Sequence, residues 1–96
     1  MRYARFDWDA EKNRQNQLKH GVSFELAQQV FFDPRCVIAA DAGHSSSEAR
    51  LYCIDRVQDG ILMVRFTVRR KVVRIIGAGY WRKGKRLYEK KNRVYR

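Results

Sequence analysis

The fold of this chain is decided by residues 61–78, which read ILMVRFTVRRKVVRIIGA. Two runs rich in β-branched residues flank the polar pair Arg70-Lys71, and each run alternates with a period of two. This pattern predicts a β-hairpin. The pair lacks the Gly or Asn that two-residue turns prefer, so a longer and looser turn is the alternative.

A two-residue turn fixes three cross-strand pairs: Arg69 with Val72, Thr67 with Arg74, and Arg65 with Ile76. In this register one face of the hairpin is apolar and predicts the core side, formed by Val64, Phe66, Val68, Val73, Ile75 and Gly77. The opposite face carries Arg65, Thr67, Arg69 and Arg74. A slip of one residue would mix the two sets, which supports the register.

A second hairpin is predicted at Asp59-Gly60, where residues 50–57 alternate ahead of the first hairpin. Pairing Gln58 with Ile61 sets two apolar pairs on the core side: Cys53 with Phe66 and Leu51 with Val68. The arginine side then receives Tyr52, Ile54 and Arg56. The two hairpins therefore agree on which side of the sheet is the core.

Two helices are predicted ahead of these strands, after a short first strand in residues 3–8. Asp9 is a good N-cap for a polar helix over residues 10–20, whose only apolar anchors are Ala10 and Leu18, and Gly21 is placed to end it. Ser23 caps the second helix. Its buried stripe recurs at helical spacing and consists of Phe24, Ala27, Val30 and Phe31.

The remaining segments complete the outline. Residues 36–40 form a short apolar strand, residues 41–49 a loop, and Leu87 and Tyr88 dock a short C-terminal helix, whereas residues 90–96 are expected to fray. The prediction is one α+β domain over residues 1–96. Its sheet has four to five strands and is mainly antiparallel.

The charge of the chain points to an anionic partner. Its 96 residues include 21 Lys and Arg against 10 Asp and Glu, a net charge of +11 with a pI near 10.3. Nucleic acid is the first candidate, an acidic protein the second and an anionic membrane surface a distant third. No signal peptide or membrane-length apolar run is found, so a cytoplasmic protein is expected. Cys36 and Cys53 then predict buried free thiols, with a disulfide as the alternative.

Several sequence blocks, in order along nearly the whole chain, carry a family resemblance: FDWD at 6–9, NRQN at 13–16, KHGVSF at 19–24, the pattern His-Ser-x-x-Glu-x-Arg at 44–50, and VVRII at 72–76. In these blocks the chain resembles the BrnT family. The resemblance implies a RelE-like fold and a type II toxin, a small ribonuclease that blocks translation. It also implies a BrnA-type antitoxin as partner, with DNA contacted only indirectly through that antitoxin.

The chain departs from the family pattern after its last strand. Members usually continue with Ser-Ala-Arg, whereas this chain has Gly77-Ala78-Gly79, and Asp55 stands where a small turn residue is expected. Either a basic residue farther along replaces the lost arginine, or this copy is a weakened enzyme. The candidates for that replacement are Arg82, Lys83, Lys85 and Arg86.

RNA cleavage needs a base for the 2′-hydroxyl, a cation for the charged phosphorane and an acid for the leaving oxygen. The sequence has no metal-ligand cluster, so a route without metal or cofactor is expected. The candidate catalytic residues are His20, Glu48, Arg65 and Arg74; the candidate RNA-binding residues are Lys19, Arg50, Tyr52, Arg69, Arg82 and Lys83.

Each candidate has a structural alternative. Arg65, Arg69 and Arg74 would clamp phosphate through forked contacts, or would simply be solvated on an exposed face. His20 would transfer a proton, or would only cap its helix. Glu48 would pair locally with Arg50 to order the loop, or belong to the active face.

Roles in a loop contact and in base stacking are predicted for three further side chains. His44 is expected to make a loop contact with Asp41, and Tyr52 and Trp81 to stack on bases. Three functions remain open from the residues: a ribonuclease toxin, a non-catalytic RNA-binding module, and a subunit whose charge is matched by an acidic antitoxin.

Overall fold

The computed structural model describes residues 5–41, 43 and 48–92. Its elements, in chain order, are β1 (Arg5–Asp7), α1 (Ala10–His20), α2 (Phe24–Ala27), the 3-10 helix η1 (Gln28–Phe32), β2 (Val37–Ala40), β3 (Leu51–Val57), β4 (Gly60–Arg69), β5 (Val72–Tyr80) and α3 (Gly84–Lys91). The α+β class and the predicted order of strands and helices are confirmed.

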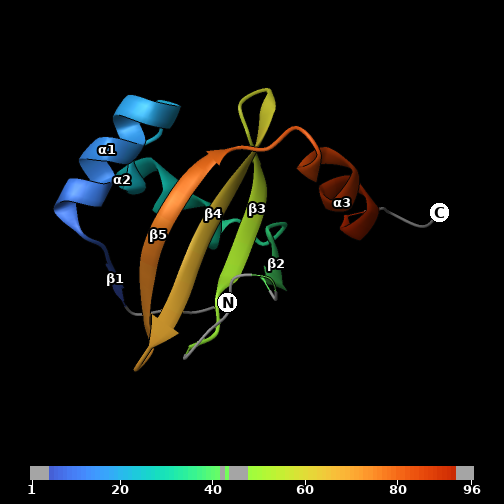
Figure 1. Cartoon of the computed structure of the whole chain (residues 1–96). Helices are drawn as coiled ribbons and strands as arrows, with labels where there is room; N and C mark the ends of the chain where they lie inside the picture. The colour runs from blue at the N-terminus through green and yellow to red at the C-terminus, as the bar shows by residue number, and fades with distance from the viewer. Residues whose placement is uncertain (1–4, 42, 44–47, 93–96) are drawn as a thin grey trace.

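The five strands form one sheet in the order β1-β5-β4-β3-β2 (Figure 1). β2, β3, β4 and β5 pair antiparallel with their neighbours, but β1 pairs parallel with β5. The expected mainly antiparallel sheet is therefore a mixed one. No hairpin turn joins β1 to β5, so their relative direction is not set by any local sequence signal.

The turn between β4 and β5 has two residues, as predicted. Arg70 and Lys71 have φ of 50° and 66°, so both occupy the left-handed region that this type of turn requires. The pairs Arg69–Val72 and Thr67–Arg74 are confirmed. The looser turn suggested by the absence of Gly and Asn is wrong, because the paired strands hold the turn closed.

The third predicted pair fails because the ladder shifts at Arg65/Phe66. Phe66 pairs with Ile75, and Arg65 pairs with Gly77, so Ile76 is the extra residue of a β-bulge. The bulge moves Gly77 from the predicted core side to the arginine side. Ala78 takes a place in the core instead.

The hairpin between β3 and β4 turns one residue earlier than predicted. Val57 pairs with Gly60, and Gln58, with φ of 56°, begins the turn in place of Asp59. The strands are thereby offset by two residues: Leu51 lies opposite Phe66 and Cys53 opposite Val64. An even offset leaves every side chain on its predicted face.

The main core lies between the sheet and the N-terminal helices (Figure 1). The sheet residues predicted for it are buried or pack against it: Leu51, Cys53, Val64, Phe66, Val68, Val73 and Ile75. They meet Phe24, Ala27, Val30 and Phe31. The second predicted helix is α-helical for only one turn and continues as η1, which ends at the extended residue Asp33 before Pro34.

A smaller cluster lies on the opposite side of the sheet, under α3. Tyr88 is buried there against Ile54 and Ile61, so the docking of a C-terminal helix is confirmed. Lys90 and Lys91 belong to this helix, and residues 93–96 of the predicted frayed tail lie outside the described residues.

Both ends of α1 lie where the sequence predicts them, but the residues that attach the helix to the sheet are not the predicted ones. Asp9 caps it and Gly21 ends it with φ of 68°. Leu18, a predicted anchor, is 75% exposed. The helix docks instead through Asn13 and Asn16, both 8% exposed.

Asn16 takes the place of a neighbouring strand at the edge of β5. Its Nδ2 donates to the carbonyl oxygens of Ala78 (2.8 Å) and Val22 (2.8 Å), and its Oδ1 accepts from the Ala78 N–H (3.2 Å). β1 pairs only with Val72, Val73 and Arg74, so this amide serves the edge that β1 leaves open. The carboxyl half of β5 is thus fixed against the end of α1.

Both cysteines are free thiols. Cys53 is buried, and burial raises the pKa of its thiol; Cys36 is half-buried. None of the helices in the described ranges has the length and apolar composition needed to cross a membrane.

Candidate functional site

The surface opposite the main core carries arginines on β4 and β5, as predicted. We call Arg65, Thr67, Arg69 and Arg74 the arginine face. Thr67 is buried and donates to the carbonyl oxygen of Ala49 (2.9 Å), so it is a structural member. The arginines remain on the solvent side, with Arg65 and Arg69 exposed and Arg74 half-buried.

Arg65 lies across the backbone of β5. A Cβ built on Gly77 would come within 2.9 Å of Arg65 Nη2 and 3.4 Å of its Nε. The guanidinium therefore occupies the space that any side chain at residue 77 would fill. The absence of a side chain there allows a long, exposed cation to lie flat on the sheet.

His20 lies against the next glycine on the same face. A Cβ on Gly79 would be 3.6 Å from His20 Cγ and 3.7 Å from Nδ1. Its position follows from two local facts: α1 ends at Gly21, and Asn16 fixes the helix to Ala78. His20 is exposed.

Gly77 and Gly79 lie opposite Arg65 and Met63, so both would direct a side chain to the arginine side. Two residues along a strand span about 7 Å. The two glycines thus leave a strip of bare backbone, with a guanidinium over one end and an imidazole over the other. We call this strip, with Arg65 and His20, the glycine track.

The other two arginines are already paired with carboxylates. Arg74 Nη1 lies 3.2 Å from Asp7 Oδ1. Arg69 makes a forked contact with Glu48: Nε donates to Oε2 (2.8 Å) and Nη2 to Oε1 (2.7 Å). Both pairs are at the end of β5 away from the glycine track.

This forked contact bears on the role of Glu48. The hydrogen bonds from Arg69 lower the pKa of the Glu48 carboxyl, and both its oxygens face that guanidinium. A carboxylate in this state is a weak base. The alternative of a pair with Arg50 is not the contact found, because Glu48 reaches across to β4. His44 lies outside the described residues.

The remaining predicted RNA-binding residues divide between two regions. Lys19 is exposed beside His20, and half-buried Arg50 precedes β3. Tyr52 contacts Trp81 edge to face, with ring centroids 5.9 Å apart. Arg82 and Lys83 lie outside the arginine face, at the start of α3.

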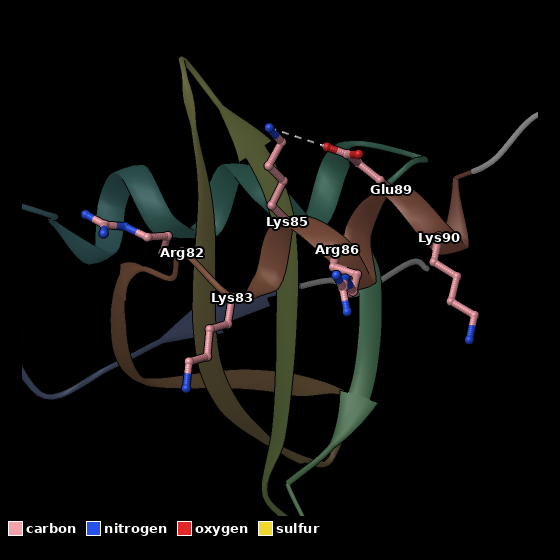
Figure 2. Close-up of a pocket in the computed structure, with 6 residues that line it drawn as sticks. All are labelled: Arg82, Lys83, Lys85, Arg86, Glu89 and Lys90. Atoms are coloured by element: carbon pink, nitrogen blue, oxygen red, sulfur yellow. Dashed lines mark ion pairs between the residues drawn. The ribbon is translucent and has the colours of Figure 1, made fainter.

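The cations of α3 and of the two residues before it form a separate basic surface (Figure 2). Its residues are Arg82, Lys83, Lys85, Arg86, Glu89 and Lys90. Glu89 is the single carboxylate among them and lies 3.8 Å from Lys85 and from Arg56. A strong excess of positive charge is left on this helix.

Arg65 and His20 of the glycine track are predicted from the sequence, whereas Asn16, Gly77 and Gly79, which position them, are not. Asn16 was quoted only as part of a sequence block, and the polar spacing Asn13-x-x-Asn16 on one helix face was the available signal. Gly77 is predicted on the core side of the hairpin, and Gly77 and Gly79 otherwise mark only the loss of the usual arginine. Their contribution depends on the bulge at Arg65/Phe66, which the alternation pattern does not reveal.

A buried carboxyl pair lies outside these surfaces. Asp55 is 4% exposed, and its Oδ1 has no hydrogen-bond partner. Burial, followed by a hydrogen bond with Asp33, raises the pKa of Asp55 to about 6. The pKa of Asp33 is lowered, chiefly by the backbone N–H of Arg35 and also by Asp55. Below about pH 6, Asp55 is therefore the protonated member of the pair and Asp33 the ionised one. Within the described ranges, no three His, Cys, Asp or Glu side chains are grouped to hold a metal ion.

The fold and the surface charges define a small basic α+β protein suited to binding a polyanion. Residues 8–84 match the profile of the family described as "Ribonuclease toxin, BrnT, of type II toxin-antitoxin system", and the chain therefore belongs to this family. The family implies a ribonuclease toxin, with RNA as substrate and an antitoxin protein as partner. No curated protein sequence matches the chain significantly.

Proposed function

We propose that this chain is the toxin of a type II module, an endoribonuclease that cleaves RNA on the glycine track without a metal. The observation that carries the proposal is the placement of Arg65 and His20 over Gly77 and Gly79. A cation and an imidazole thus face one strip of backbone that carries no side chains of its own. The family membership supplies the substrate class.

In the proposed reaction, His20 takes the proton of the ribose 2′-hydroxyl. The 2′-oxygen then attacks the adjacent phosphorus, and the bond from phosphorus to the 5′-oxygen breaks. The products are a 2′,3′-cyclic phosphate and a 5′-hydroxyl, whose oxygen takes its proton from solvent. Arg65 stabilises the extra negative charge of the phosphorane through its forked N–H donors.

The paired arginines have a second role in this proposal. Arg74 and Arg69 exchange their carboxylate partners for RNA phosphates, which positions the strand but adds little to the chemical step. Glu48 acts as a counter-ion of Arg69 in the absence of RNA. Lys19, Arg50 and Tyr52 border the path of the strand.

The partner of the toxin is proposed to be a BrnA-type antitoxin that also binds DNA. A protein with a net charge of +11 is matched by an acidic segment, whose association is fast at low salt. We also propose the RelE-like arrangement, a single domain over residues 1–96 and a cytoplasmic site of action.

The test uses purified protein and a long single-stranded RNA, with and without EDTA, and compares His20→Gln with the unchanged chain. Glutamine keeps hydrogen-bonding capacity but does not titrate, so cleavage should fall about 100-fold or more while the melting temperature is kept. Arg70→Gln, in the exposed β4–β5 turn, is the matched control for loss of one surface charge. Full cleavage by folded His20→Gln would remove the histidine from the mechanism, and loss of cleavage in EDTA would refute metal independence.

A cellular assay completes the test. Induction of the chain alone should stop growth and degrade RNA, and co-expression of the antitoxin encoded beside it should restore both. RNA binding without any cleavage would favour the alternative of a non-catalytic RNA-binding module.

A further inference from the structure

A hollow of about 550 Å³ lies at the end of β5, where the β3–β4 turn meets the start of α3. Its size is within the range of small-ligand sites. Aromatic and cationic side chains line it, chiefly Tyr80, Trp81, Arg56, Arg82 and Lys85. None of the contacts of the glycine track involves these residues.

Tyr80 is held flat on the backbone of the turn. A Cβ on Gly60 would be 2.7 Å from Tyr80 Cδ1 and 3.1 Å from Cε1, so the ring occupies the space above this glycine. One side of the ring is thereby fixed, yet the residue remains 49% exposed. An aromatic ring fixed on one side and open on the other is a stacking platform.

Trp81 is fixed in a similar way. A Cβ on Gly84 would be 2.6 Å from Trp81 Cε3, and the Trp81 backbone N–H donates to the Ile61 carbonyl oxygen (2.8 Å). Tyr52 meets its indole edge to face. Two neighbouring aromatic residues of the hollow are therefore seated on glycines, and neither needs to reorganise to accept a ligand.

The charges at the rim suit a phosphate. Arg56 and Lys85 share Glu89 at 3.8 Å each, and Arg56 also lies over the Tyr88 ring at 5.8 Å. Arg82 is exposed and forms no ion pair with any carboxylate in the described part of the chain. Asp59 is the single acidic lining residue. The rim thus has more cations than the carboxylates near it neutralise.

We propose that this hollow binds one nucleotide of single-stranded RNA, with the base stacked on Tyr80 and the phosphate held by Arg82 and Lys85. The proposal rests on the proposed function for its substrate class. Gly79 and Tyr80 are consecutive residues of β5, so the Tyr80 ring lies on the opposite side of the sheet from the glycine track, and a bound strand reaches the hollow by passing around the end of β5. The hollow is then a subsite for a nucleotide flanking the scissile bond.

An acidic protein segment would use the same cations, but it would not require a flat, half-open aromatic ring. Stacking on an aromatic side chain tolerates every base. The subsite is therefore expected to add affinity and to discriminate little between purines and pyrimidines.

The experiment measures binding of AMP, UMP and ribose 5-phosphate to the full chain by NMR, following the two indole N–H signals. Trp81 borders the hollow, and Trp8 packs against the main core as an internal control. Both nucleotides should shift the Trp81 signal alone, with ribose 5-phosphate at least 10-fold weaker. Tyr80→Ala should weaken the nucleotides to the level of ribose 5-phosphate, whereas Tyr80→Phe should keep their affinity.

Gly60→Ala is a second variant that keeps the aromatic ring but tilts it off the turn. It should weaken AMP without changing the binding of ribose 5-phosphate. Equal affinity for AMP and ribose 5-phosphate, or unchanged AMP affinity in both Tyr80→Ala and Gly60→Ala, would overturn the subsite. Displacement of AMP by an equimolar short polyglutamate peptide would assign the hollow to an acidic protein instead.

Different outcomes contradict the nucleotide subsite and the proposed ribonuclease activity. Nucleotide binding at Trp81 in a protein that cleaves no RNA would contradict only the ribonuclease. Cleavage that depends on His20, in a protein whose Trp81 signal ignores nucleotides, would contradict only the subsite.

Discussion

The cations at the two ends of β5 differ in whether they contact a carboxylate. At the end near Val72, Arg69 and Arg74 each contact a carboxylate, whereas at the glycine end Arg65 and His20 lie over bare backbone, with no ion pair to any described carboxylate. Salt-paired cations on a surface contribute mainly to the local electrostatic balance. Cations that lie on the sheet without such partners are available to an incoming anion. The comparison supports the proposal that RNA cleavage takes place at the glycine end.

The largest effect is expected from removing the side chain that fixes the glycine end. Asn16→Ala deletes three hydrogen bonds and leaves the Ala78 N–H and C=O without partners. We expect a loss of about 2–4 kcal/mol in the free energy of unfolding, measured by urea denaturation. Leu18→Ala in the same helix is the control and should cost little, because Leu18 is mostly exposed. Equal effects of the two changes would contradict the polar docking of α1.

The docking of α1 shows where the sequence was sufficient and where it was not. Period-two alternation predicted both faces of the hairpin correctly as far as Ile75, because burial on one side constrains every second residue, but the bulge reverses the face of Gly77. In α1 the same reasoning selected Leu18, since apolar residues normally mark the buried face. An exposed strand edge needs hydrogen-bond partners rather than apolar contact, and Asn16 supplies them.

The candidate site was also predicted from the sequence only in part. Arg65, Arg69 and Arg74 were predicted on one face, and the structure places them there. Their partners were not predicted, because Asp7 and Glu48 reach them across the sheet from distant sequence positions. The bulge that pairs Arg65 with Gly77 leaves no mark in an alternating pattern.

The arginines at the two ends of β5 should differ in their effect on cleavage. Arg65→Gln should lower the cleavage rate about 100-fold, because a guanidinium that stabilises the phosphorane is lost. Arg69→Gln should lower it only a few-fold, because in the proposed mechanism Arg69 only positions RNA, and it already has a carboxylate partner. Single-turnover cleavage measures both rates at saturating enzyme. A greater loss in Arg69→Gln would reverse the assignment of the two ends.

A substitution at the buried carboxyl of Asp55 tests a position away from both ends of β5. Its pKa of about 6 lies above the unfolded value of about 3.9, so the folded state retains a proton that the unfolded state has lost. Stability should therefore fall as the pH rises from about 4 to about 6, and remain lower above that. Asp55→Asn should recover about 2–3 kcal/mol at pH 7.5 and nothing at pH 3.5.

Thermal unfolding across this pH range checks the effect of Asp55→Asn. RNA cleavage at pH 7.5 should be unchanged, since the carboxyl pair lies outside the arginine face and the glycine track. A variant that is less stable than the unchanged chain at pH 7.5 would show that the Asp33–Asp55 contact stabilises the ionised pair.

The sharpest test of the comparison comes from the two glycines themselves. Gly77→Ala places a Cβ 2.9 Å from Arg65 Nη2, closer than such contacts are found, so the flexible end of Arg65 must move. Gly79→Ala brings its Cβ only to 3.6 Å from His20 Cγ, an ordinary van der Waals contact. Both changes add the same methyl group to the same face of one strand. Gly77→Ala should therefore lower the cleavage rate about 10-fold through displacement of Arg65, whereas Gly79→Ala should remain within about two-fold of the unchanged chain.

The matched pair separates displacement of Arg65 from the general effect of covering the strip. Equal losses would mean that the bare backbone itself, rather than the position of the guanidinium, is what the RNA requires.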